Sequence, residues 1–369
     1  MNQSTDLFVF QALELATQAL FLSNPSPRVG CVLVASNGET IGLGFMQQPD
    51  GPHAEVRALR DAALNGRDTQ GSTAYVTLEP CSHHERMGSC CDALIQAGII
   101  KVVASLTDPD PELTGQGFER LRAAGIEVVA GPGAEASREL NIGYFSRMIR
   151  GTPWVRMKTA ASLDGTTALH NGASQWITSR AARADGHAWR ARAGAVLTGI
   201  GTVLDDNPRL DVREVATARQ PHVVVVDSRL QTPPDANILM PGRECYIYAA
   251  AEDLAKQAAL EARGARVIYL PSASGKVDLS AMLKDLGRRG INELHVEAGH
   301  KLNGSLLREK LVDELLVYLA PRLLGQGSGM ADMGPLTALA DGLPLEFRSV
   351  EMLGPDLRIV ARIEGRDNF

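Results

Sequence analysis

Apolar residues along this chain follow two alternating patterns. Short continuous runs are typical of buried strands, and longer segments with apolar positions three or four residues apart are typical of helices. In the first part, a helix is expected over residues 7–22, and another is expected to begin at His53, with apolar positions Val56, Leu59 and Ala63. The expected strands are 29–34, 40–45, 73–78, 101–105 and 126–129, with further helices after Cys90, at 117–124 and in a stretch ending near Arg150. This pattern predicts an α/β sandwich around a single sheet.

The alternation restarts near Gly151, where a strand at 154–160 leads to the turn Ser162–Gly165. Thr178 and Ser179 are expected to cap a helix that runs to about residue 193. Further strands are expected at 195–198, 223–226, 244–248, 266–270, 293–296, 314–320, and around 347–352 and 357–362, with helices between 248 and 266 and at 300–309. We therefore expect a second α/β domain and place the two domains at residues 1–148 and 152–369.

Composition narrows the class of protein. With 44% hydrophobic and 22% charged residues among 369, the chain has the balance of an ordinary globular protein. Its net charge of −6 argues against a broad nucleic-acid surface. Five cysteines, two of them adjacent, do not resemble a secreted disulfide framework, and the first residues lack the basic region of a signal peptide. No apolar run is long enough to span a bilayer, so we expect a cytoplasmic protein with no membrane partner.

Candidate metal chemistry lies in the first domain. His53, Cys81 and Cys90 offer one imidazole and two thiols, a ligand set suited to tetrahedral zinc. Three protein ligands leave the fourth position open for a water molecule, and the metal lowers the pKa of that water to near neutrality. Glu55 lies two residues beyond the histidine and is placed to move protons rather than to bind metal. This combination is typical of zinc-dependent base deaminases.

Alternative interpretations of these residues stay open. Eight residues separate Cys81 and Cys90, where the common motif has two, and the adjacent Cys91 leaves the identity of the second sulfur ligand undecided. A purely structural zinc site would need a fourth ligand, which Cys91 or His83 would have to supply. A nucleic-acid base editor is a further alternative, but the chain has no Lys/Arg runs to favour it.

The second domain contains two glycine-bearing turns between a strand and a helix, where backbone N–H groups could hold phosphates. Gly199–Gly201 lacks the third glycine of a dinucleotide fingerprint, because Leu204 occupies that position. Gly299–Ser305 is better placed. Lys158, Arg190 and Arg213 are candidate phosphate clamps, so spacing alone predicts a nucleotide or sugar-phosphate binder.

Motifs in both halves resemble those of the bifunctional riboflavin-biosynthesis deaminase–reductases, in the same order and over nearly the full length. They are Pro52–Val56, Thr77–His84, Lys158 with Ser162–Gly165, Ser174–Thr178 and Val296–Gly299. The resemblance implies an N-terminal cytidine-deaminase-like α/β/α domain and a C-terminal dihydrofolate-reductase-like α/β domain that uses NADPH. It also implies a pyrimidine ribose phosphate as substrate and a dimer formed through the reductase domain.

The resemblance assigns roles to individual residues. Zinc would bind His53, Cys81 and Cys90. Glu55 would transfer protons while the amino group on carbon 2 of a diaminopyrimidinone is replaced by oxygen and leaves as ammonia. The reductase would then convert the ribosyl side chain to ribityl. The residues implied to hold NADPH are Ala160, Trp176, Thr202, Asp206, Ser228, Gly299, His300, Lys301, Leu302, Asn303, Gly304 and Ser305. Those implied to hold the substrate are Lys158, Ser174, Arg190, Leu210, Arg213 and Glu297.

Departures from the family pattern motivate an alternative function. Ser26 stands where the family usually has Asn, Met46 where it has His, and residues 85–89 differ from the usual loop between the cysteines. All three changes fall where the deaminase should touch its substrate, while the metal set is intact. A paralogue serving a secondary pathway from the same pyrimidine phosphate, of the azapteridine-toxin type, is therefore the second hypothesis. The reductase half departs mainly at Ala160 and His300.

Overall fold

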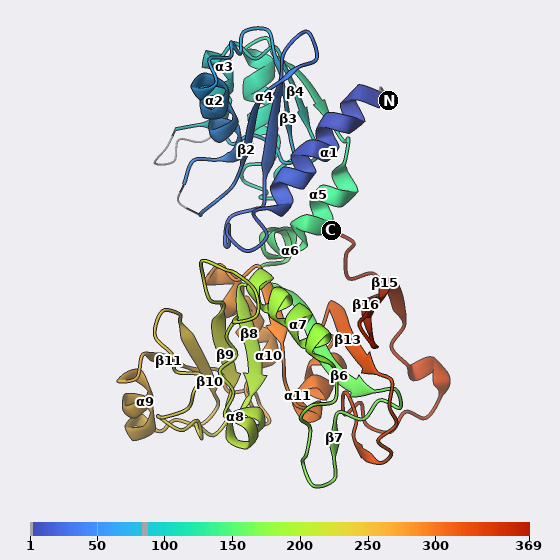
Figure 1. The fold of residues 1–369 in the computed structure, drawn as a ribbon. Coiled ribbons are helices and arrows are strands. Elements are labelled where there is room, and N and C mark those ends of the chain that lie inside the picture. The colour runs from blue at the N-terminus through green and yellow to red at the C-terminus, as the bar shows by residue number, and fades with distance from the viewer. Residues whose placement is uncertain (1–2, 50, 83–87) are drawn as a thin grey trace. The chain divides into compact units, whose positions relative to one another are not determined.

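The computed structural model describes residues 3–49, 51–82 and 88–369. The chain divides into two compact units, Met1–Arg150 and Gly151–Phe369, and each is described by itself (Figure 1). Within the described ranges, no helix is long and apolar enough to cross a membrane.

Unit 1 is a three-layer α/β/α sandwich around a five-stranded sheet of order β2-β1-β3-β4-β5. Helices α1 and α5 cover one face, and α2, α3 and α4 cover the other (Figure 1). The elements are α1 (Gln3–Thr17), β1 (Gly30–Val34), β2 (Thr40–Phe45), α2 (Ala54–Leu64), β3 (Thr73–Val76), α3 (Cys90–Gln96), β4 (Lys101–Ala104), α4 (Gln116–Ala123), β5 (Glu127–Ala130), α5 (Ala134–Leu140) and α6 (Ile142–Arg150). The fold class expected for this half is confirmed.

The buried face of α2 differs from the one that apolar spacing predicts. Its buried residues are Ala54, Glu55, Ala58 and Ala62, whereas Val56 and Leu59 are only half-buried and Ala63 is exposed. The reason is steric. A Cβ on Gly44 would lie 2.1 Å from the carbonyl oxygen of Ala54, and one on Gly42 would lie 2.3 Å from that of Ala58. Helix and strand therefore approach closely enough that only small residues fit between them.

Helix α1 also departs from expectation. It ends at Thr17 rather than near residue 22, and hydrogen-bonded turns follow it up to the prolines. Phe10 is exposed, and the helix buries Val9, Ala12 and Leu13.

Unit 2 is built on a nine-stranded sheet of order β11-β10-β9-β8-β12-β6-β13-β16-β15. Its strands are β6 (Trp154–Ser162), β8 (Ala195–Gly199), β9 (His222–Val226), β10 (Cys245–Ala249), β11 (Ala265–Tyr269), β12 (Glu293–Val296), β13 (Glu314–Ala320), β15 (Leu345–Leu353) and β16 (Asp356–Ile363), with β7 (Ala168–Leu169) and β14 (Gly327–Ser328) paired separately. Its helices are α7 (Arg180–Arg192), α8 (Ile200–Asp206), α9 (Leu254–Glu261), α10 (Leu279–Arg288), α11 (His300–Arg308) and the short η1 (Leu339–Asp341).

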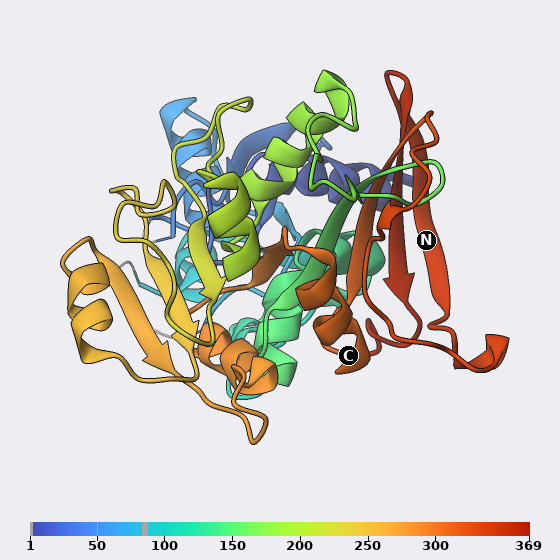
Figure 2. The same ribbon diagram turned by 90° about the horizontal axis from the view of Figure 1, so that it is seen from below.

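Two apolar cores lie on opposite faces of this sheet. Helices α10 and α11 pack on one face, through residues such as Met282, Leu286 and Leu306, and α8 and α9 pack on the other, through Val203 and Leu260 (Figure 2). Helices α10 and η1 were not expected from the sequence; the other helices and the main strands lie within a few residues of their expected positions.

The parallel strands decide where a site can form. β11, β10, β9, β8, β12, β6 and β13 all run in the same direction, so their carboxyl ends meet at one edge of the sheet. Ligands in open α/β sheets bind outside that edge. The turns after β8 and β12, which carry the two glycine motifs, are neighbours there.

Candidate active sites

Three segments of unit 1 bring His53, Cys81 and Cys90 together. His53 is the N-cap of α2, Cys90 is the first residue of α3, and Cys81 lies in the loop after β3. The Nδ1 atom of His53 lies 3.2 Å from the sulfur of Cys90 and 3.5 Å from that of Cys81. All three ligand atoms lie within 4.8 Å of one another, which suits a single small cation. Both helix starts add a positive dipole end, which favours thiolate.

The neighbouring thiol of Cys91 faces away from this cluster. Its sulfur donates to the carbonyl oxygens of Pro80, at 3.2 Å, and Gly117, at 3.5 Å. The geometry therefore favours Cys90 over Cys91 as the second sulfur ligand. His83, the other candidate for a fourth ligand, lies outside the described residues.

In the cluster, the thiol of Cys90 donates a hydrogen bond to the sulfur of Cys81. A hydrogen bond from Cys90 lowers the pKa of the Cys81 thiol to about 4, although burial raises it, and the same pairing raises the pKa of Cys90. A cation held between the two sulfurs would take the place of the proton in that hydrogen bond. The donor set therefore fits zinc.

Glu55 lies beside the cluster in the first turn of α2. It is only 3% exposed, and burial raises the pKa of its carboxyl to about 7, against the opposing charge of His53. The nearby thiol of Cys90 opposes this rise in pKa. A carboxyl group with a pKa near neutrality can both accept and return a proton at physiological pH.

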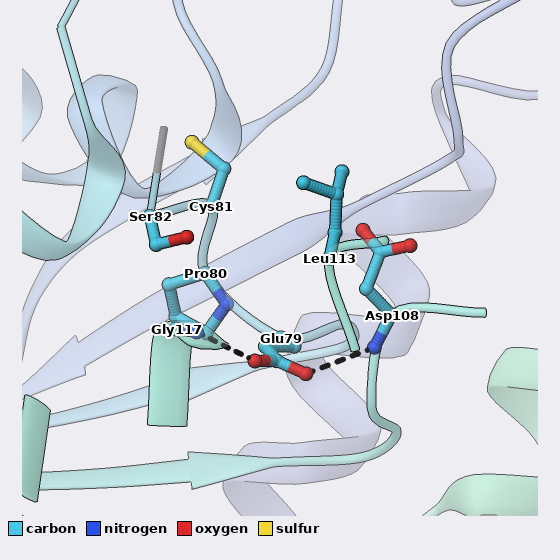
Figure 3. Close-up of a pocket in the computed structure, with 7 residues that line it drawn as sticks. All are labelled: Glu79, Pro80, Cys81, Ser82, Asp108, Leu113 and Gly117. Carbon is cyan, nitrogen blue, oxygen red and sulfur yellow. Dashed lines mark hydrogen bonds between the residues drawn. The ribbon is translucent and has the colours of Figure 1, made fainter. Parts of the chain in front are cut away.

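Glu79 is a buried carboxylate that sequence reasoning did not single out, although it lies in the Thr77–His84 motif. It accepts hydrogen bonds from the backbone N–H groups of Asp108, Gly115, Gly117 and Phe118. Figure 3 shows the small pocket beside it, which Cys81 also lines, with its sulfur turned away from Glu79. The pocket is lined by Glu79, Pro80, Cys81, Ser82, Asp108, Leu113 and Gly117.

The positions that depart from the family pattern have local partners. The hydroxyl of Ser26 donates to the carbonyl oxygen of Pro49 at 3.3 Å, and Met46, directly after β2, is buried. Residues 85–87 of the divergent loop lie outside the described residues, whereas Ser89 caps α3 by accepting from the N–H of Asp92.

In unit 2, candidate substrate residues lie close together around Glu297, directly after β12. Sheet register places Lys158 of β6 and Thr198 of β8 on either side of it. Arg190 of α7 binds both carboxylate oxygens, one of them at 2.9 Å, and the ammonium of Lys158 lies 3.6 Å away. Burial alone would raise the pKa of Glu297, but the charges of Arg190 and Lys158 hold it well below its usual range.

Arg213 and Leu210 join this cluster through Asp211, which the sequence analysis did not identify. The guanidinium of Arg190 donates to the carbonyl oxygen of Asp211 at 3.0 Å, and Arg213 lies 2.5 Å from its carboxylate. Arg209 pairs with the same carboxylate at 3.1 Å. The spacing Arg-x-Asp-x-Arg was the available signal, but alternating charges are common on exposed loops.

Two buried histidines near the same carboxylate were also missed. His295, two residues before Glu297 on β12, is fully buried, and its Nε2 lies 3.4 Å from the glutamate oxygen. Burial lowers the pKa of His295. Burial, then the charges of Arg190 and Arg213, lowers the pKa of His187 to about 4. Both rings are therefore neutral near pH 7.

The residues proposed to hold NADPH at the phosphate-binding turns lie at the carboxyl edge of the sheet or next to it. Thr202 and Asp206 are on α8, Ser228 lies two residues beyond the end of β9, and α11 begins at His300 with Gly299 as its N-cap. A Cβ on Gly299 or on Gly201 would meet no atom within 4 Å, so space is open in front of both turns. Backbone N–H groups at such a helix start fit a dinucleotide phosphate.

The remaining candidates are dispersed. Ala160 packs against an apolar cluster that includes Tyr318 of β13. Trp176 is exposed, with the guanidinium of Arg183 4.6 Å from its ring centroid, and Ser174 lies in the same loop. The structure connects neither Ala160, Trp176 nor Ser174 directly with the Glu297 cluster, so their roles stay predictions.

Comparisons with known proteins match both units. Residues 153–359 match the model of the RibD C-terminal domain, and residues 2–106 match that of the cytidine and deoxycytidylate deaminase zinc-binding region. The chain is 42% identical over 365 residues to riboflavin biosynthesis protein RibD of Escherichia coli, covering 95% of this chain and 97% of that protein. The chain belongs to the RibD family.

Solved RibD structures agree over both units. RibD of Acinetobacter baumannii superimposes with a TM-score of 0.88 at 37% identity, covering 98% of this chain and 99% of that one. A diaminohydroxyphosphoribosylaminopyrimidine deaminase/5-amino-6-(5-phosphoribosylamino)uracil reductase from Thermotoga maritima gives 0.86 at 30% identity, with the same coverage. RibD membership confirms the expected fold class and a bifunctional riboflavin-biosynthesis enzyme, with a zinc-dependent deaminase and an NADPH-dependent reductase. The paralogue hypothesis gains no support, because the matched full-length relatives are riboflavin biosynthesis proteins.

Proposed function

We propose that unit 1 deaminates 2,5-diamino-6-ribosylamino-4(3H)-pyrimidinone 5′-phosphate and that unit 2 then reduces the ribosylamino side chain to ribitylamino. The observation that supports this most directly is the cluster of His53, Cys81 and Cys90, with the buried Glu55 beside it. The Thermotoga relative carries both activities in its name. The two catalytic domains correspond to residues 1–148 and 152–369.

In the deaminase, His53, Cys81 and Cys90 would hold zinc, which would supply a Lewis acid that lowers the pKa of a water molecule to near neutrality. Glu55 accepts a proton from the attacking water, delivers it to the ring nitrogen and then assists the departure of ammonia from carbon 2. Water thus supplies the oxygen of the new carbonyl group, and the amino group leaves as ammonia. The pKa of Glu55, about 7, suits both directions of transfer.

In the reductase, bound NADPH would supply the hydride for reduction of the open-chain sugar at its first carbon, and solvent would supply the accompanying proton. Gly299–Ser305, Thr202, Asp206, Ser228, Ala160 and Trp176 would hold the cofactor. Arg190 and Arg213, with Leu210 and Ser174, bind the substrate, and Lys158 contacts its phosphate. Glu297 orients Arg190 and Lys158, because its carboxylate lies within ion-pair distance of both.

We also propose that the protein acts in the cytoplasm as a homodimer formed through unit 2. Strand β15 is an edge strand of the nine-stranded sheet, and Phe347, Val350 and Met352 on it are exposed. Exposed apolar edge strands are ready to pair with another chain. Sedimentation analysis of the wild type and of Met352→Lys tests this, since the substitution should shift the equilibrium towards monomer.

The test of the enzymatic function is an assay of the purified, zinc-loaded full chain on the diaminopyrimidinone phosphate. Ammonia release and NADPH oxidation are followed separately. Ammonia release should proceed without NADPH, and NADPH oxidation should depend on prior deamination. A protein that oxidises NADPH without ever releasing ammonia would contradict the proposed deaminase.

A further inference from the structure

Glu79 makes an unusual number of contacts for a single side chain. It is only 6% exposed, and both carboxylate oxygens accept two hydrogen bonds each. One oxygen accepts from the N–H groups of Asp108 and Gly115, each at 3.0 Å, and the other from Gly117 at 2.8 Å and Phe118 at 3.2 Å. Figure 3 shows the bonds from Asp108 and Gly117. One negative charge thus satisfies four backbone donors in the segment between β4 and α4, including the start of α4.

The loop that follows Glu79 is bonded to the start of α3, which carries the second sulfur of the cluster. Cys81, two residues after Glu79, accepts on its carbonyl oxygen from the hydroxyl of Ser89 at 3.0 Å and from the N–H of Cys91 at 3.1 Å. The N–H of Cys90 donates to the sulfur of Cys81 at 3.3 Å. Both sulfur ligands therefore belong to one hydrogen-bonded unit that begins at Glu79.

The start of α4 closes this unit from the other side. A Cβ on Gly117 would lie 2.1 Å from the carbonyl oxygen of Pro80, so the helix begins in direct contact with the loop that carries Cys81. The thiol of Cys91 donates to the carbonyl oxygen of Gly117, and the guanidinium of Arg120 pairs with Asp92 of α3. Helices α3 and α4 are thus held to the same loop.

We propose that Glu79 is a positioning residue of the deaminase. It holds the sulfur of Cys81 at the metal position and, through the same carboxylate, holds residues 108–117 as the opposite wall of the pocket beside that sulfur. The inference rests on the proposed ligand set and extends it to a residue that touches neither metal nor substrate. The negative charge matters because four N–H donors converge on it, and charge-assisted hydrogen bonds are the strong ones.

The test is Glu79→Gln in the full chain. The amide retains the shape, but its NH₂ group faces backbone donors and cannot accept from them. We expect zinc affinity, measured by competition with a chromophoric chelator, to fall about 10- to 100-fold, as is typical when a group that orients a metal ligand is lost. The KM for ammonia release should rise, because the pocket wall moves, while NADPH oxidation on supplied deaminated substrate should be unchanged.

Three further variants make the test specific. Glu119→Gln removes the same charge from the exposed side of α4 and should leave zinc affinity and KM at wild-type values. Glu79→Asp retains the charge with a shorter reach and should recover part of both. Gly117→Ala retains the carboxylate but forces α4 away from Pro80, and should weaken zinc binding in the same way.

A role in folding alone would reduce the amount of folded protein without changing the zinc affinity or the KM of the folded fraction. Glu79→Gln with both values unchanged from wild type would overturn the proposal. If Glu79→Gln does not fold, Glu79→Asp and Gly117→Ala decide, and normal zinc affinity in both would overturn it. Failure of the wild type to release ammonia would contradict the proposed function instead, since zinc affinity is measured without substrate.

Discussion

The two candidate sites of this chain are built in contrasting ways. In unit 1, the three candidate metal ligands and Glu55 lie within 38 residues of sequence and in three neighbouring segments, and the donor types of the ligands indicate a four-coordinate metal such as zinc. In unit 2, the cluster around Glu297 combines α7, β6, the end of β12 and the loop after α8, which are as much as 139 residues apart from Lys158 to Glu297. Its members are ordinary charged residues.

The difference shows what makes a site recognisable. Coordination chemistry restricts ligand type and spacing so strongly that a set such as His53, Cys81 and Cys90 indicates a metal from the sequence alone. Ion pairs require neither an unusual residue type nor a fixed spacing in the sequence. Most charged residues are solvated surface groups. Only the parallel register of β6, β12 and β8 shows that Lys158, Glu297 and Thr198 are neighbours. The following variants test whether the two sites function as separately as they are built.

The largest effect is expected for Glu55→Gln. Ammonia release should fall about 10²- to 10⁴-fold, because an amide cannot carry a proton between water, ring and leaving group. Zinc content should remain at the wild-type level, and NADPH oxidation on supplied deaminated substrate should not change. Steady-state assays of both half-reactions with metal analysis provide the measurement. Retained deamination would remove Glu55 from the mechanism.

The adjacent cysteines provide a matched pair. Cys90→Ser should lose most of its zinc and its deaminase activity, whereas Cys91→Ser should retain both, because only the sulfur of Cys90 faces His53 and Cys81. Zinc content after dialysis against a chelator is the readout. Equal loss in the two variants would show that the second thiol also binds metal.

Arg190→Ala should affect only unit 2. It leaves the buried carboxylate of Glu297 without its bidentate partner, and a broken buried pair costs about 3–5 kcal/mol, less here because Lys158 remains. We expect lower thermal stability and loss of NADPH oxidation with ammonia release intact. Calorimetry and the two assays check this. Recovery of stability in Arg190→Ala/Glu297→Gln would confirm that the unpaired charge is the cause.

Arg213→Ala should have a milder effect. Its side chain is 49% exposed, so the loss of its ion pair with Asp211 should change the stability of the protein little. If Arg213 binds the substrate phosphate, the KM of the reductase should rise about fivefold, equivalent to roughly 1 kcal/mol, and the difference from wild type should shrink at high salt. An unchanged KM would refute this role.

The smallest effect concerns acid stability. Burial and the neighbouring arginines lower the pKa of His187 from 6.5 to about 4. Between these values the unfolded chain binds a proton that the folded chain does not, so the free energy of unfolding falls as the pH drops from 6.5 towards 4. His187→Asn should reduce this dependence by less than about 3 kcal/mol. The pKa values of His222 and His295 are also lowered, so the variant should keep the part of the pH dependence that these two residues cause. Thermal melts of both proteins at about pH 5 and about pH 7.5 measure it, on either side of the ordinary histidine pKa; parallel pH dependence would contradict the assignment.

Much of the fold could be predicted from the sequence, because strands of apolar β-branched residues such as Val223–Val226 have few alternatives. The buried face of α2 could not be predicted from hydrophobicity. Ala54, Ala58 and Ala62 are buried because only small residues fit where the helix lies against the glycines of β2. The same limit applies to the sites. The donor types of His53 and Cys81 indicate metal directly, but the role of Glu79 depends on four N–H groups whose positions only the folded chain reveals.

The close contact between the glycines of β2 and the alanines of α2 determines how substitutions in β2 would affect the metal site. His53 and Glu55, the proposed zinc ligand and proton carrier, are two residues apart at the start of α2, so any displacement of that helix moves them together relative to the two sulfurs. A substitution such as Gly44→Ala would therefore leave the spacing between His53 and Glu55 intact. Its first measurable effect would be a lower affinity for zinc.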